Sequence, residues 1–458
     1  MKGRTLKLLM LLILIPALSS CSPVETTAEH LMKAPKLSED FYQINRTLKN
    51  LQGNNIVLKY PKFGSNNSPY VMSDIDKDGE DEVIVFYSSD DNNSEVKFSV
   101  LDKINGEWKI IFSTQESGID IDKVLIADIL ENKNNQIIVS WVKSNGVDRT
   151  LQIYNYENGA IKCIYTKLYV TDVFLLDINN DCKNELLTID KTLKITPNVE
   201  TITKVDNINK LGNGLYVRLK PGSEKYEKIT TGKISKGVNA LFLDAIYDEN
   251  DMFCTEIIVC NKNGSLINLC YVKDNNYKEN QQLIEKTVRN KNIFCRDVDN
   301  DGIVEIPKNL FYRRYLKTTV KNLQPIIVWQ KYGDVSWLIS NLSIENVKDG
   351  YSFIFPNNWY TCLHNDLLSN YNVNEKDINI GVIAYYNEEE NKLTFITNDS
   401  YEQEVLSIVV KKSTDEIEKD YKEIMRKNDF VYYAKINSKN KNFSITLNEV
   451  KKCFSFQY

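Results

Sequence analysis

Residues 74–87 read Asp-Ile-Asp-Lys-Asp-Gly-Glu-Asp-Glu-Val-Ile-Val-Phe-Tyr, an acidic loop followed directly by an apolar run. A glycine at the sixth position of the loop permits a sharp turn. The apolar run has the length and composition of a buried strand. Carboxylates occupy the first, third, fifth and ninth positions of the loop: Asp74, Asp76, Asp78 and Glu82. The stretch therefore joins a dense set of oxygen atoms to a strand.

The same arrangement occurs twice more along the chain. The corresponding residues are Asp177, Asn179, Asp181 and Glu185 in one loop, and Asp297, Asp299, Asp301 and Glu305 in the other. Copies that have lost most of these side chains begin at Asp128 and Asp244, so the five aspartates are 54, 49, 67 and 53 residues apart. A unit of about 50 residues with four strands is the size of one propeller blade.

The chain between the loops has the pattern of an all-β protein. Short apolar or alternating runs such as Ile137–Trp141 and Leu151–Tyr156 are separated by turn residues. Asn105-Gly106 and Asn158-Gly159 are dipeptides favoured in two-residue hairpins. We therefore expect a mainly β fold in which each unit covers an apolar face of its neighbour.

Calcium is the cation that best fits the acidic loops. It takes six to eight oxygen ligands at about 2.3–2.6 Å, whereas magnesium prefers fewer protein ligands. An EF-hand is excluded, because its bidentate glutamate stands at position 12 and precedes a helix. Here the glutamate stands at position nine and precedes a strand. The loops predict structural calcium, and the alternative interpretation is a solvated turn without metal.

Residues 56–345 resemble the FG-GAP and VCBS-type repeats of calcium-binding β-propellers. The resemblance rests on the three acidic loops and the apolar strands that follow them. It implies a β-propeller-like repeat domain of about five to six blades with calcium at the loops. The sequence departs from the family at Cys182, where a glycine is expected, and lacks the family's Phe-Gly and Gly-Ala-Pro signature.

The N-terminus is organised as a bacterial lipoprotein signal peptide. A basic tip precedes the apolar stretch from Leu8 to Leu18, which is too short for a permanent membrane span. Leu18-Ser19-Ser20-Cys21 resembles a lipobox. That resemblance implies that Cys21 is the first mature residue and carries acyl chains such as palmitate, which hold a soluble domain on a membrane. The alternative is an ordinary secreted protein.

We expect four segments along the chain. They are the signal peptide (1–20), a tether and N-terminal helix (21–55), the repeat domain (56–345) and a small C-terminal α+β module (346–458). In the first helix, apolar residues recur at helical spacing from Phe41 to Leu51. In the C-terminal module, Ser413 and Glu416 form a capping-box pattern that predicts a helix to about Lys427. A strand is expected at Asn442–Leu447.

Charge and cysteine content narrow the partners and the compartment. The formal net charge of −5 argues against nucleic acid and anionic lipid headgroups as partners. The nine cysteines lack the spacing of a zinc site. Cys254, Cys260 and Cys270 lie in or beside apolar runs, where free cysteine behaves as a small core residue.

Two classes of function remain open. The first is a non-enzymatic lipoprotein, held outside the cytoplasm, whose propeller face binds an envelope protein or a glycan. The second is a surface hydrolase or lyase carried on a propeller scaffold. The chain has two histidines, His30 and His364, and no phosphate loop, Gly-x-Ser-x-Gly or His-Glu-x-x-His motif. No catalytic residue is assigned, and the binding role is favoured.

Overall fold

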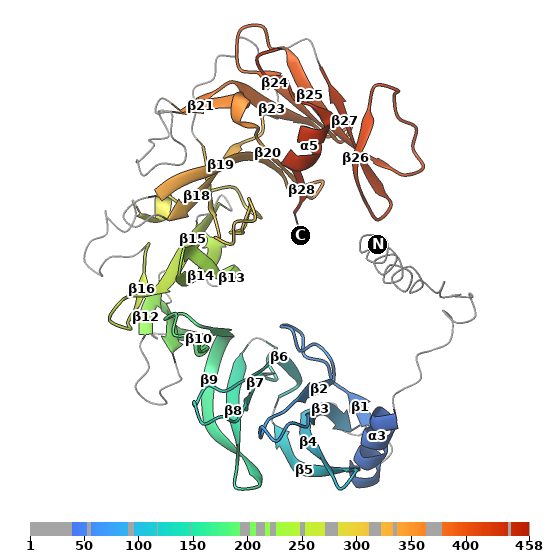
Figure 1. Cartoon of the computed structure of the whole chain (residues 1–458), viewed down its shortest axis with the longest axis vertical. Coiled ribbons are helices and arrows are strands. Elements are labelled where there is room, and N and C mark those ends of the chain that lie inside the picture. Colours follow the sequence, from blue (N-terminus) through green and yellow to red (C-terminus); the bar gives the residue numbers. More distant parts are fainter. Residues whose placement is uncertain are drawn as a thin grey trace, which may run out of the picture.

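The chain is a β-propeller-like repeat protein built from successive antiparallel sheets. Figure 1 shows these sheets following one another along an arc, from α3 at one end to the sheet that contains β24 and β25 at the other. None of the helices that are described is long and apolar enough to cross a membrane. The computed structural model describes residues 39–52, 56–89, 96–116, 118–146, 148–192, 202–207, 216–219, 226–247, 252–270, 283–310, 322–332, 337–362, 378–437 and 441–457.

Helix α3 (Glu39–Gln52) covers the first sheet, as its apolar spacing predicts. Ile44 and Leu48 are buried, and they pack in one cluster with Val83 and Val85. At the start of the helix, Asp40 accepts hydrogen bonds from Lys103 Nζ at 2.9 Å and Trp108 Nε1 at 3.0 Å. The helix is therefore held by its apolar stripe and by polar contacts, which include bonds from Tyr70 to Asn45 and from Thr47 to the Trp108 carbonyl.

The first sheet forms the first repeat. Its strands are β1 (Ile56–Leu58), β2 (Tyr70–Ser73), β3 (Glu82–Ser89), β4 (Val96–Ile104) and β5 (Glu107–Glu116). The predicted hairpin turn lies between β4 and β5, where Asn105 and Gly106 have φ of 53° and 79°. Positive φ at both central residues is the type I′ pattern, whose twist matches that of the strands.

The second sheet contains two repeats in seven strands. These are β6 (Asp120–Ala127), β7 (Gln136–Val142), β8 (Arg149–Glu157), β9 (Ala160–Leu176), β10 (Glu185–Thr192), β11 (Ile202–Asn207) and β12 (Tyr216–Leu219). The first part of β9 pairs with β8 and the second part pairs with β10. One 17-residue strand therefore ends the second repeat and begins the third.

Two further sheets form the fourth and fifth repeats. The fourth contains β13 (Tyr226–Ser235), β14 (Val238–Ile246), β15 (Phe253–Cys260) and β16 (Leu266–Asn268). The fifth contains β17 (Ile306–Asn309), β18 (Ile326–Tyr332), β19 (Trp337–Asn346), β20 (Tyr351–Ile354) and β28 (Phe454–Phe456). Because β20 pairs with both β19 and β28, the expected boundary near residue 345 lies inside a sheet.

The C-terminal part packs on the fifth repeat. It contains β21 (Tyr360–Cys362), β22 (Ile378–Ile380), β23 (Val382–Asn387), β24 (Lys392–Thr397), β25 (Glu404–Lys412), β26 (Lys422–Lys427), β27 (Phe430–Ile436) and α5 (Leu447–Cys453). Trp359 is buried beside Phe353, Phe355 and Phe395, with ring centroids 5.2–5.6 Å away. These rings join the two sheets in a single core.

The helix predicted from Ser413 is wrong. Its second half is instead β26, which pairs with β27, and the Ser413 N–H donates to the carbonyl of Asp429 at 2.8 Å. Pairing with a distant strand outweighs the local capping pattern. The strand expected at Asn442–Leu447 is also wrong, because Thr446 caps α5 in a capping box with Glu449.

Candidate metal centres

Four loops share one backbone conformation, and three of them are the acidic loops that the sequence singles out. They begin at Asp74, Asp128, Asp177 and Asp297. The fourth position is left-handed in each: Lys77, Glu131, Asn180 and Asn300 have φ of 56–65°. The sixth position is left-handed too: Gly79, Lys133, Cys182 and Gly302 have φ of 69–97°. Cys182 therefore keeps the turn that normally favours glycine.

The first and ninth residues close each loop through hydrogen bonds. A carboxylate oxygen of the first aspartate accepts the N–H of the sixth residue at 2.8–3.2 Å. The ninth side chain accepts the N–H of the second residue at 2.7–3.0 Å. All four ninth residues are buried: Glu82, Gln136, Glu185 and Glu305. The fifth side chain adds a further bond in each loop, because it accepts the N–H of the seventh residue at 2.8–3.0 Å. The loop is thus a frame closed by its own side chains.

In the Asp74 loop the carboxylates face one another without a counter-charge from the described part of the chain. Oxygen atoms of Asp74, Asp76 and Asp78 lie within 4.8 Å of one another. Asp74 Oδ1 is buried, and no donor among the described residues bonds to it. Burial, reinforced by the charges of Asp76 and Asp102, raises the pKa of Glu82 to about 7 although the Ile75 N–H opposes the shift. The loop is therefore an anionic site that a cation would stabilise.

In the loop at Asp128 an amide group lies among the loop oxygens. Gln136 stands at the ninth position, and its Nε2 donates to Asn132 Oδ1 at 3.1 Å and to the Asn134 carbonyl at 2.9 Å. It also donates to Asn155 Oδ1 at 3.0 Å. The oxygens of the fifth and seventh positions thus converge on one point, which is the geometry expected for metal ligands. Here a neutral NH₂ group occupies that point.

The Asp177 loop brings together its four predicted residues. Asn179 Nδ2 donates to Asp181 Oδ2 at 3.2 Å and to Glu185 Oε1 at 3.0 Å. The Asp181 N–H donates to Asp177 Oδ1 at 3.0 Å. Burial raises the pKa of Glu185 against the hydrogen bond from Ile178. An asparagine amide therefore links the two carboxylates that would otherwise repel each other.

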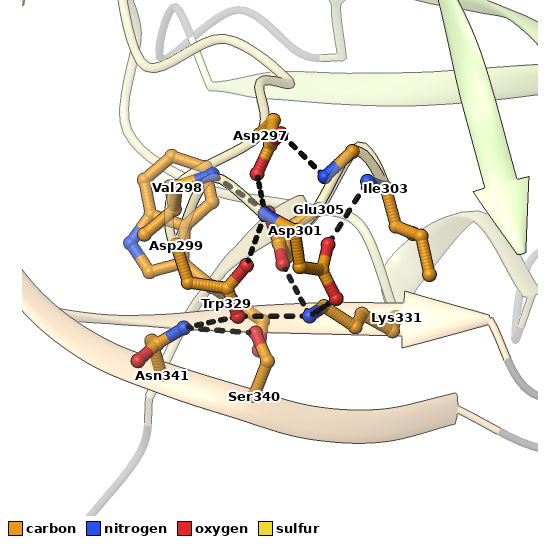
Figure 2. A network of polar contacts seen from close by, with 11 residues as sticks. Asp297, Val298, Asp299, Asp301, Ile303, Glu305, Trp329, Lys331, Ser340 and Asn341 are labelled. Carbon is orange, nitrogen blue, oxygen red and sulfur yellow. Dashed lines mark hydrogen bonds and ion pairs between the residues drawn. The ribbon is translucent and has the colours of Figure 1, made fainter. Parts of the chain in front are cut away.

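The Asp297 loop contains an ammonium group from another strand. Oxygen atoms of Asp297, Asp299, Asp301 and Glu305 all lie within 4.8 Å of one another. Lys331 Nζ, on β18, lies 2.8 Å from Asp299 Oδ2, 2.6 Å from Asp301 Oδ2 and 3.0 Å from Glu305 Oε1 (Figure 2).

The ammonium changes the acidity of the side chains around it. Burial acts to raise the pKa of Asp301, but the hydrogen bonds from Lys331 and Ile303 outweigh it, and the pKa is lowered. Burial still raises the pKa of Glu305 to about 7. The contrast with the Asp74 loop is clear, because there burial raises the pKa of Asp76 and no lysine of the described chain opposes it.

The loops also lie at the joints between repeats. Asn135, one residue before β7, donates its side-chain amide to the Asp74 carbonyl at 2.8 Å, and its N–H to the Ile75 carbonyl at 3.0 Å. In the same way Asn239 of β14 donates to the Asp177 carbonyl. A cation bound in one loop would therefore stabilise the contact with the next repeat as well.

Among its described residues, the fourth copy contains no such loop. Asp244 lies within β14 rather than at the end of a strand, and its carboxylate is fully buried. Arg289 Nη2 lies 2.5 Å from Asp244 Oδ1, and Thr255 Oγ1 donates to the same oxygen at 2.6 Å. The recurring aspartate of this repeat thus belongs to a buried ion pair.

Two residues beside the loops were not predicted from the sequence: Lys331 at the Asp297 loop and Asp102 at the Asp74 loop. Neither belongs to a motif, and each comes from a strand that lies later in the chain than the loop it faces. The replacement at position nine was visible in advance, because Gln136 has the shape of glutamate with an amide in place of the carboxylate. Cys21 and the signal peptide lie outside the described residues.

Comparisons with known proteins add little beyond general likeness. No family model matches the chain, and no curated protein matches it. A solved structure of a protein from Lactobacillus plantarum is similar, with 10% identity and a TM-score of 0.31, and covers 76% of this chain and 93% of that one. A rhamnogalacturonan lyase from Bacillus licheniformis has 10% identity and a TM-score of 0.30, with 76% of both chains covered. The Dos1 propeller has 9% identity and a TM-score of 0.30, with 74% of this chain and 69% of that one covered. Likeness at these TM-scores supports no inference about function.

Proposed function

We propose that the chain is a lipid-anchored scaffold outside the cytoplasm, stabilised by calcium, which presents a binding surface to an envelope protein or a glycan. The observation that carries the calcium part is the Asp74 loop. Three carboxylates converge there beside the buried Glu82, and one Asp74 oxygen has no hydrogen-bond donor within the described chain. Buried charge of this kind is costly unless a cation accompanies it.

Calcium would be held by Asp74, Asp76, Asp78 and Glu82. All four offer hard oxygen atoms, the ligand type that calcium takes from proteins. When bound, the ion supplies positive charge that offsets the mutual repulsion of the carboxylates. The Asp177 loop, which has an asparagine in place of one carboxylate, stays a predicted second site.

The role of the ion would be structural. Because the Asp74 carbonyl also accepts the amide of Asn135, the loop connects the first repeat to the second. A ligand that binds only the folded state at 100 times its Kd adds about 2.7 kcal/mol to the free energy of unfolding. Such a gain would hold the repeats in a fixed arrangement and so keep a binding surface in shape.

The calcium part is tested by thermal unfolding of the full mature chain in EDTA, in calcium and in magnesium. The melting temperature should fall in EDTA and recover with calcium. Asp76→Asn should reduce the response, because it removes a ligand of the Asp74 loop, while Asp399→Asn, a change in the C-terminal part, should preserve it. A melting temperature that is the same in EDTA and calcium would refute the calcium part of the proposal.

The anchor is supported by the lipobox sequence at Cys21 and is tested separately. The wild-type protein should partition into the detergent phase, and Cys21→Ala should move it to the aqueous phase. The binding role is tested with oligosaccharide arrays followed by mass spectrometry of the bound sugars. Intact bound sugars agree with a binding protein, whereas cleaved products would favour the lyase or hydrolase alternative.

A further inference from the structure

The residue across the sheet from the ninth position differs in charge from loop to loop. In the fifth repeat Ile306 pairs with Gln330, so the next pair in register is Glu305 with Lys331. In the first repeat Val83 pairs with Leu101, so the next pair is Glu82 with Asp102. Directly opposite side chains in an antiparallel pair lie close enough to interact. One loop thus faces a cation and the other a further anion.

We infer that this cross-strand residue decides whether a loop takes an external cation. Lys331 supplies the cation of the Asp297 loop, which therefore needs no calcium, while Asp102 leaves the Asp74 loop to an external ion. The inference rests on the proposed calcium at the Asp74 loop and narrows the predicted sites.

The contacts of Lys331 are those a metal ion would need. Its ammonium lies 2.6–3.0 Å from oxygens of the third, fifth and ninth positions, Asp299, Asp301 and Glu305 (Figure 2). Calcium at about 2.3–2.6 Å from the same oxygens would have to occupy the same space. The lysine and the ion therefore exclude each other.

The sheet holds Lys331 in place for this role. Trp329 lies two residues earlier on β18, so both side chains point to the same face. Its ring is buried against Val298, the second residue of the loop. Asn341 of β19 donates to Asp299 Oδ2 at 3.3 Å, next to the ammonium. The ammonium is thus positioned before any ion arrives.

The Asp128 loop gives an independent case of the same arrangement. Its ninth residue is Gln136, and the residue opposite in register is Asn155. The two amides bond at 3.0 Å, and Gln136 Nε2 also reaches the oxygens of the fifth and seventh positions. Here the opposite residue is neutral, and the cation position is filled by an NH₂ group from the ninth residue. The loops at Asp74, Asp128 and Asp297 share one backbone conformation. They differ in the ninth residue and its cross-strand partner.

The test is a reciprocal exchange of charge in the full mature chain. Calcium bound per chain is measured by equilibrium dialysis and by titration calorimetry with calcium chloride. Lys331→Asp should bind one more calcium than wild type, and Asp102→Lys should bind one fewer. Lys348→Asp is the control, because Lys348 pairs with Glu388 at 3.5 Å outside the loops and should leave the number unchanged.

Several outcomes separate the role of the cross-strand residue from the proposed calcium at the Asp74 loop. An unchanged number in Lys331→Asp overturns the inference, even if Asp76→Asn shows that the Asp74 loop binds calcium. A gained site in Lys331→Asp together with no binding by wild type supports the inference for Lys331 alone. That result overturns the part that concerns Asp102 and refutes the proposed calcium at the Asp74 loop. If Asp102→Lys does not fold, Asp299→Asn in the wild-type background decides: no loss of calcium is expected, and loss of one ion would overturn the inference.

Discussion

The side chain of Asn135 bonds to the backbone carbonyl of Asp74 at 2.8 Å, which ties the first acidic loop to the repeat that follows it. This contact is made to the backbone of the loop and not to its carboxylates. Asn239 makes the corresponding bond to the carbonyl of Asp177. The joint between repeats is therefore a recurring feature that combines an asparagine with the first carbonyl of a loop.

Replacing Asn135 with alanine should weaken this joint. The change removes one hydrogen bond and leaves the Asp74 carbonyl without that donor, at a cost of about 1–2 kcal/mol. Chemical denaturation in saturating calcium measures the effect. Asn263→Ala, in the exposed turn between β15 and β16, is the control and should change stability by less than about 0.5 kcal/mol. Equal effects of the two changes would contradict a role for the joint.

Replacing Cys182 with glycine should stabilise the protein. Cys182 has φ of 69°, a left-handed conformation that costs most residues about 1–2 kcal/mol and costs glycine nothing. Glycine's greater freedom in the unfolded chain offsets part of that gain, so we expect about 0.5–1 kcal/mol. Cys182→Ala removes the thiol but keeps the strain, so it should give no gain. The result would be contradicted if the alanine and glycine variants melted at the same temperature.

Breaking the buried pair of Arg289 and Asp244 should be severely destabilising. Both side chains are fully buried, and Arg289→Met would leave the Asp244 carboxylate without its guanidinium. Removing one member of such a pair costs about 3–5 kcal/mol. Arg426→Met, which disrupts an exposed pair with Glu423, is the matched control and should cost no more than about 1 kcal/mol. The double variant Asp244→Asn with Arg289→Met should lose less stability than the two single variants lose in sum. Chemical denaturation of the wild type, both single variants and the double variant measures this difference.

The thiols should react in two classes. Burial raises the pKa of Cys254 to about 12 and raises the pKa of Cys295 far above its ordinary value. Both are therefore protonated at pH 8, and both are shielded from reagent. Cys163 and Cys182 are exposed free thiols. Iodoacetamide at pH 8, followed by peptide mass spectrometry, should modify the exposed pair within minutes and the buried pair only after denaturation. Rapid native labelling of Cys295 would contradict its burial.

Local patterns were sufficient to predict the loops and most strands. The alternation of acidic residues with a glycine, followed by an apolar run, predicts a turn and then β3, because both depend on neighbours within a few residues. The hairpin at Asn105 and Gly106 and the helix α3 follow from equally local rules. The charge that faces each loop does not follow from local rules, because it belongs to a residue that strand pairing brings from elsewhere in the chain. Nothing near Asp297 in the sequence points to Lys331.

Two errors have the same physical origin. The segment after Ser413 has a helical capping pattern, but pairing with β27 makes it β26. Asp244 follows an apolar run just as Asp74 does, but the strand continues past it and Arg289 neutralises it. In both cases a contact distant in sequence outweighs a local preference, and a single sequence does not display that contact.

Strand β9 is shared by the second and third repeats, which therefore form one continuous unit. Because Ala160–Leu176 continues from the second repeat into the third, with only an irregularity at Tyr169, no linker separates these two units. During synthesis the last strand of the second repeat and the first strand of the third leave the ribosome as one segment. Under a pulling force the two would come apart in one event rather than two. A protease would find no boundary there, so a stable fragment should begin or end outside this pair.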